Sequence, residues 1–164
     1  MGLFSKKKKV SVDDMSMQAM IAANDAIGKL KGFNDVDDVQ SMTISMGYFY
    51  GFLKLHLNSI TSLDVANTII NNSITNLENA TKGNPAFKNL GSTVRTIAKD
   101  ATENMKYAMR EFKDKPFMSM AVFYLKDLCN STTLDISKVE IAENNMRLLY
   151  GMAANVTNDI KIVK

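Results

Sequence analysis

Apolar side chains recur every three or four residues along most of this chain, which is the spacing of one face of an α-helix. The rhythm is most regular from Val39 to Ile60 and from Val139 to Ile160. No segment alternates between apolar and polar residues for long enough to predict a β-strand. We therefore expect an all-α fold, a compact bundle of five to six helices in which short loops join antiparallel neighbours.

Capping residues give the expected boundaries of the first three helices. The first should run from Val12 to Lys31 behind a capping-box-like Ser11, and Gly32 should end it. Asn34 is the expected cap of the second helix, Ser62 opens the third, and Gly83 closes it. The first helix should turn the following side chains inward: Met17, Met20, Ile21, Ile27 and Leu30.

The second half of the chain predicts three more helices. Asn84 followed by Pro85 should begin the longest one, which reaches about Lys113 and turns Phe112 inward. The segment from Phe117 to Leu128 is apolar on nearly every side, so we expect it in the middle of the bundle. The last helix should begin near Asp135 and continue to Ile160.

Length and composition indicate one domain. The chain has 164 residues, of which 46% are hydrophobic and 23% charged, and only two prolines interrupt it. The net charge of +3 comes from a lysine run at positions 6–9. We assign residues 1–10 to a basic N-terminal arm and residues 11–164 to a single helical-bundle domain.

The expected location is the cytoplasm, or a virion if the protein is a particle component. Cys129 is the single cysteine, which excludes an internal disulfide and favours a reducing compartment. The N-terminus has too few apolar residues for a secretory leader. No apolar run reaches the length that spans a bilayer.

The search for catalytic chemistry ends mostly in exclusions. Neither of the common glycine-rich phosphate loops is present. His56 is the single histidine, and together with one cysteine it cannot build a four-ligand Cys/His zinc site. The acids at positions 35, 37 and 38 lack the spacing of a calcium loop and suit the first turn of a helix. We expect no catalytic residue, metal, cofactor or small-molecule substrate.

Two side chains keep an alternative interpretation. His56 could act as a lone general base, but its position in an apolar stripe favours core packing with one ring nitrogen hydrogen-bonded. Cys129 could be a reactive thiol, but the end of an apolar helix favours a small buried hydrophobe. Gly47 and Gly51 form a small-residue patch that is expected to let a neighbouring helix, or a copy of the same helix, pack closely.

Two groups of basic residues are candidate contacts for nucleic acid, anionic membrane or a partner protein. The first is the N-terminal lysine run, whose alternative role is that of a solubilising tail. The second is a row of cations on one face of the fourth helix, whose alternative role is that of a solvated outer face. The candidate contact residues are Lys6, Lys7, Lys8, Lys9, Lys88, Arg95, Lys99, Lys106, Arg110 and Lys113.

These features favour a non-enzymatic helical subunit that contacts other protein chains as a homo- or hetero-oligomer, such as a connector or adaptor in a phage or viral particle. Met15, Met118 and Met120 do not fit a single inward stripe, and exposed methionine suits adaptable protein contacts. The alternative is a methionine-rich core that accounts for most of the twelve methionines. An accessory protein that binds nucleic acid or anionic membrane through the basic residues is the alternative. An inhibitor or immunity-type binding protein is the third.

Overall fold

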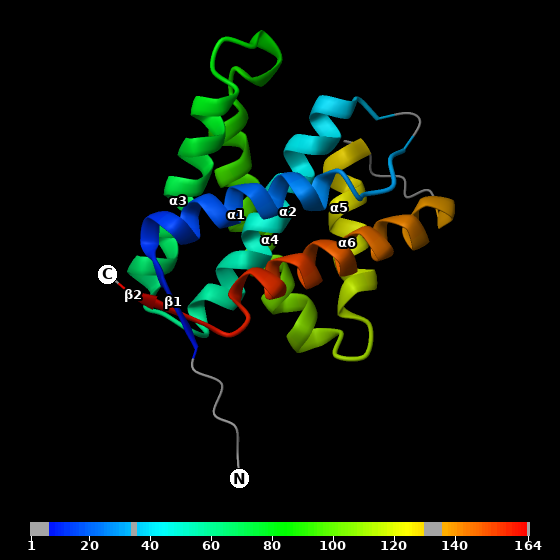
Figure 1. The fold of residues 1–164 in the computed structure, drawn as a ribbon. Coiled ribbons are helices and arrows are strands. Elements are labelled where there is room, and N and C mark those ends of the chain that lie inside the picture. The colour runs from blue at the N-terminus through cyan, green and yellow to red at the C-terminus, as the bar shows by residue number, and fades with distance from the viewer. Residues whose placement is uncertain (1–6, 34–35, 130–135, 164) are drawn as a thin grey trace.

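A computed structural model describes residues 7–33, 36–129 and 136–163. Within these residues the chain forms six α-helices, one short 3-10 helix and two short strands (Figure 1). In chain order the elements are β1 (Lys8–Ser11), α1 (Val12–Ile27), α2 (Asp38–Asn58), α3 (Leu63–Ala80), η1 (Pro85–Phe87), α4 (Leu90–Glu111), α5 (Pro116–Cys129), α6 (Ile136–Thr157) and β2 (Ile160–Val163). The predicted all-α bundle is confirmed.

Helix α2 is the centre of the bundle. Every residue from Ile44 to Leu53 is buried, because α2 packs against α4 and α6 and also contacts α1, α3 and α5. Helices α1 and α6 run side by side in opposite directions (Figure 1). The expectation that the fifth helix would be central is wrong, since α5 leaves Met118 and Lys126 exposed.

The N-terminal caps follow local side-chain chemistry. Ser11 accepts a hydrogen bond from the Asp14 backbone N–H at 3.1 Å, and Ser62 caps α3 through the N–H of Val65. Asp37 caps α2 by accepting from the N–H of Gln40 at 2.9 Å. The cap expected at Asn34 lies outside the described residues.

The first helix is shorter than predicted. It ends at Ile27, not Lys31, and Gly28, not Gly32, follows its last turn. The side-chain amide of Asn145 on α6 exchanges two hydrogen bonds with the backbone of Lys31. These long-range bonds satisfy the backbone N–H and carbonyl of Lys31, which lies outside the helix.

The buried face of α1 also differs from the predicted one. Met15, Ala19, Ala23 and Ala26 are buried, while Met17 and Ile21 are exposed. The small alanine side chains lie where α1 packs against α2, α3 and α6, and the larger residues are left outside. Met120 is likewise fully buried, so it and Met15 belong to the core rather than to an exposed contact surface.

A two-stranded parallel sheet, which the sequence did not predict, joins the two ends of the described chain (Figure 1). Residues 8–10, assigned to the arm, lie in β1, where Lys8 pairs with Ile160 of β2. The last helix therefore ends at Thr157, not Ile160, and Asp159, with a φ of 54°, leads into β2. Each strand has four residues, too few to show an alternating pattern.

Two helix boundaries predicted from glycine and proline are also wrong. Helix α3 ends at Ala80 rather than at Gly83, which has a φ of 95° in the connection that follows. Asn84 and Pro85 begin η1, with the Asn84 side chain accepting from the N–H of Ala86 at 3.1 Å, and the α-helix begins only at Leu90. The Asp135 start of α6 lies outside the described residues.

Candidate interaction surfaces

The described part of the chain contains no group of three or more His, Cys, Asp or Glu side chains that could hold a metal ion. Cys129 is half-buried against the hydrophobic core rather than fully buried. The same residues include no helix long and apolar enough to cross a bilayer.

His56 lies in an aromatic environment. Its ring centroid is 4.6 Å from that of Tyr150, which in turn packs against Phe52 and Phe117. The Nε2 atom is buried and has no hydrogen-bond partner. Burial lowers the pKa of His56, and the Tyr150 backbone opposes this effect in part. The residue therefore favours the neutral form, and no carboxylate among the described residues is hydrogen-bonded to its ring.

Buried hydroxyl groups form pairs inside the bundle. Tyr48 donates to a carboxylate oxygen of Asp127 at 2.7 Å, and the Tyr124 and Ser45 hydroxyls lie 2.7 Å apart. Burial raises the pKa of Tyr48 and of Asp127, although the hydrogen bond from Tyr48 opposes the shift at Asp127. A tyrosine held neutral in this way acts as a hydrogen-bond donor that joins α2 to α5, not as a base.

Gly47 and Gly51 lie directly against α4. A β-carbon on Gly51 would be 2.8 Å from both the backbone oxygen of Ala98 and the β-carbon of Ala101. A β-carbon on Gly47 would overlap the side chain of Ile97. The Thr102 hydroxyl donates to the backbone oxygen of Gly51 at 3.2 Å. The glycine patch is therefore occupied by a helix of the same chain.

The six cations predicted to share one face of the fourth helix are not all on that helix. Lys88 precedes α4 and Lys113 follows it. Of the four cations on α4, three are paired with carboxylates: Arg95 with Glu78, Lys106 with Glu103, and Arg110 with Glu111. Only Lys99 on this helix has no ion pair within the described residues. A continuous positive strip is therefore absent from the described part of α4.

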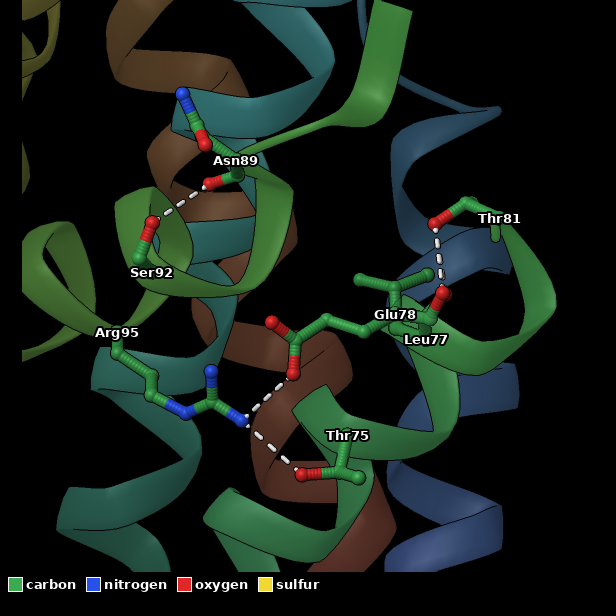
Figure 2. Close-up of polar contacts among 7 residues, drawn as sticks. All are labelled: Thr75, Leu77, Glu78, Thr81, Asn89, Ser92 and Arg95. Carbon is green, nitrogen blue, oxygen red and sulfur yellow. Dashed lines mark hydrogen bonds and ion pairs between the residues drawn. The ribbon is translucent and has the colours of Figure 1, made fainter. Parts of the chain in front are cut away.

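Arg95 ties α4 to α3 (Figure 2). Its Nη2 atom donates to Glu78 at 2.9 Å and to the Thr75 hydroxyl at 3.0 Å. Gly91 makes room for this contact, because a β-carbon there would overlap the Glu78 side chain. Arg95 thus has a structural role between two helices and is not a free cation for a partner.

The β1–β2 sheet forms a basic surface, of which the sequence predicted the N-terminal lysines but not Lys161. Lys7, Lys8 and Lys9 are exposed, and Lys161 of β2 is the direct cross-strand partner of Lys9. Lys6 lies outside the described residues. Lys161 was missed because its proximity to the arm depends on pairing between the two ends of the chain, for which four-residue strands give no local signal.

An exposed aromatic cluster lies where α4 turns into α5. We call it the aromatic turn and define it as Tyr107, Arg110 and Phe112. The rings of Tyr107 and Phe112 meet edge to face with centroids 5.9 Å apart, and the Arg110 guanidinium lies 5.9 Å from the Tyr107 centroid. Tyr107 is 43% and Phe112 is 47% exposed. The prediction that Phe112 points inward is wrong, because α4 ends at Glu111.

A second exposed apolar surface is the groove between α1 and α6. Ile21 and Ala22 line one side, and Met152 and Val156 line the other. Ile21 is 58% exposed. The sequence pattern predicts Ile21 in the core and so does not predict this groove. In the structure α1 buries its alanines and leaves Ile21 at the surface.

Comparison of the chain with protein-family models, with curated proteins and with solved structures gave no match.

Proposed function

We propose that the protein is a non-enzymatic helical subunit that assembles with a second copy of itself through the aromatic turn. The observation that carries this proposal is the exposed, edge-to-face pair of Tyr107 and Phe112 beside Arg110. Tyrosine, phenylalanine and arginine are enriched at protein interfaces and at their energetic hot spots, where rigid rings contribute area at little entropic cost. Exposed apolar side chains that gather in one place favour a partner surface.

The charges around the aromatic turn favour a second copy as the partner. Arg110, Lys113 and Lys115 alternate with Glu111 and Asp114 along six exposed positions. In a two-fold contact the same surface meets itself, so residues of one copy face different residues of the other. A surface that carries both signs of charge can then pair its cations with the carboxylates of the other copy.

The groove between α1 and α6 supports an assembly larger than a dimer. It shares no residue with the aromatic turn, so it offers a second contact. A subunit with two different contact surfaces suits a ring or layered particle, including the connector or adaptor of a phage or viral particle. In the cytoplasm or in such a particle, the protein would act through packing rather than through chemistry.

The non-enzymatic part of the proposal is supported by the surroundings of the one histidine. The ring of His56 packs against that of Tyr150, and the described carboxylates that accept hydrogen bonds do so from tyrosine, serine, lysine, arginine or backbone groups. Among the described residues no hydrogen-bonded set joins a nucleophile, a base and an orienting acid, the arrangement that hydrolases with a side-chain nucleophile use.

Light scattering on a size-exclusion column tests the proposal. The wild-type protein should have a mass at least twice that of the chain. The double variant Tyr107→Ser/Phe112→Ser should be a monomer with an unchanged far-ultraviolet circular dichroism spectrum. Leu63→Ser is the matched control, because Leu63 is 58% exposed at the start of α3, outside the aromatic turn. A wild-type monomer at every concentration, or a double variant that keeps the wild-type mass, would overturn it.

A further inference from the structure

The outer face of the β1–β2 sheet carries two lysines at directly opposed positions. Lys9 pairs with Lys161, so both side chains leave the sheet on the same side. Val10 and Ile160 are 3% and 8% exposed, which places the apolar side of the sheet against the body of the protein. The face with Lys9 and Lys161 therefore points to solvent, and Lys7, two residues before Lys9, is exposed as well.

Two like charges at opposed positions destabilise a pair of strands. Neighbouring strands lie about 4.8 Å apart, and a two-stranded sheet is marginally stable by itself. No ion pair neutralises Lys7, Lys9 or Lys161 within the described part of the chain. Asp13 and Asp14 follow β1 in the first turn of α1, and Asp14 accepts a hydrogen bond from Ser11. An anion between the two ammonium groups would replace this repulsion with two attractions.

We propose that this face binds the phosphate backbone of a nucleic acid without reading its bases. Each phosphate would lie against the ammonium groups of Lys9 and Lys161, with Lys7 contacting the next one. Lysine supplies a mobile charge rather than the fixed fork of arginine, which suits contact with phosphates rather than with base edges. No aromatic residue lies on the described strands, so base stacking contributes nothing to the contact.

The sheet fits a nucleic acid better than a membrane surface. Attachment to anionic lipid takes either a larger cluster of about four to eight basic residues or apolar side chains that enter the bilayer in addition to basic charge. The apolar residues Val10 and Ile160 point into the protein, and on the outer face only the half-buried Val163 is apolar. Contact through charge alone is sufficient for a phosphate backbone, where neutralised phosphates release counterions.

Fluorescence anisotropy with a short labelled DNA duplex over a series of salt concentrations tests the site. The affinity of the wild type should fall steeply with salt. Lys9→Gln and Lys161→Gln should each reduce the slope of log K against log salt by about 1, and the double variant by about 2. Lys9→Arg/Lys161→Arg should keep the wild-type slope. Lys99→Gln removes an exposed, unpaired lysine on α4 and should leave the slope unchanged.

A thermal melt supplies a second measurement that does not rely on affinity alone. Without DNA, Lys161→Gln should melt no lower than the wild type, because it removes a repulsion. With DNA, the wild type should gain more in melting temperature than Lys161→Gln gains.

Three results would overturn the proposal. The wild type could show no salt-dependent binding, which would leave the lysines as charges that protect open strand edges. The Lys9 and Lys161 variants could bind as the wild type does. The protein could bind vesicles of anionic lipid and show no binding to the DNA duplex. These outcomes do not depend on the mass of the protein, so the test is separate from that of the proposed self-assembly.

Discussion

The side-chain amide of Asn145 exchanges two hydrogen bonds with the backbone of Lys31, at 3.1 Å to its N–H and 2.9 Å to its carbonyl oxygen. Asn145 is 3% exposed within α6, and Lys31 lies in the connection that follows α1. One buried amide thus holds a loop to a helix that lies far along the chain. The contact holds the backbone at Lys31, where the apolar pattern of the first helix had predicted its last residue.

Asn145→Leu should destabilise the protein by about 1–3 kcal/mol, since it leaves two backbone groups without partners. Asn145→Asp should also destabilise it, because a carboxylate accepts from the Lys31 N–H but cannot donate to the Lys31 carbonyl. Urea unfolding monitored by circular dichroism measures both effects. Asn144→Leu, at an exposed neighbouring position, is the control. Equal stability of the Asn144 and Asn145 variants would contradict this assignment.

Gly51→Ala should destabilise the protein by about 1–3 kcal/mol, although alanine favours a helix, because its β-carbon would meet the backbone of α4. Gly151→Ala is a matched control inside α6, where nothing lies within 4 Å of the added carbon. That variant should gain up to about 1 kcal/mol. The two changes should therefore shift the urea midpoint in opposite directions, and a gain at both positions would show that α2 and α4 do not pack at Gly51.

The Tyr50 and Ser73 hydroxyls, 2.8 Å apart in the core, should depend on each other. Burial raises the pKa of Tyr50 to about 12, so its hydroxyl is neutral and needs a partner. Ser73→Ala should cost about 1–3 kcal/mol by leaving that hydroxyl unpaired. In the double variant Tyr50→Phe/Ser73→Ala the loss should be smaller than the sum of the single losses. Strict additivity in urea unfolding would rule out the bond.

The stability of the protein should decrease as the pH falls below the ordinary histidine pKa of 6.5. Burial lowers the pKa of His56 in the folded protein, so in this range the unfolded chain binds more protons than the folded one. This loss of unfolding free energy is absent above the pKa of His56 in the unfolded chain. It grows as the pH falls toward the lower pKa of His56 in the folded protein.

His56 is the single histidine, so a variant isolates this effect. His56→Phe keeps an aromatic ring beside Tyr150 and should flatten the pH dependence of the unfolding free energy between mildly alkaline and mildly acidic buffers. Parallel urea titrations of both proteins give the difference. An identical pH dependence of the two proteins would mean that His56 is not buried in its neutral form.

The sequence was sufficient for the fold class because helix formation leaves a periodic signal in local residues. The caps at Ser11 and Ser62 and the apolar seam of α2 were found in this way. Features set by contacts between distant segments were not found. Asn145 holds the backbone of Lys31 beyond α1 from a distant helix, and Lys8 pairs with Ile160 only when β1 and β2 meet.

The candidate surfaces also combine residues that local sequence reveals with residues that only tertiary contacts bring together. The lysines of the N-terminal run stand out in the sequence, whereas Lys161 joins them only through strand register. Met17 and Ile21 have helical spacing and were expected inside, but helical spacing alone does not say which of two faces is buried. The alanines of α1 allow closer packing than those larger side chains and occupy the buried face.

Thiol cross-linking tests the central claim, that a second copy covers the aromatic turn, most directly. In a Cys129→Ser background, Asp114→Cys puts a thiol on the exposed turn, and Leu63→Cys puts one on the control surface. A two-fold contact brings the aromatic turn of one protomer close to the same turn of its partner. A short thiol cross-linker should therefore join the Asp114→Cys protein into a covalent dimer and leave the Leu63→Cys protein monomeric. Monomeric Asp114→Cys, or equal cross-linking at both positions, would contradict the account.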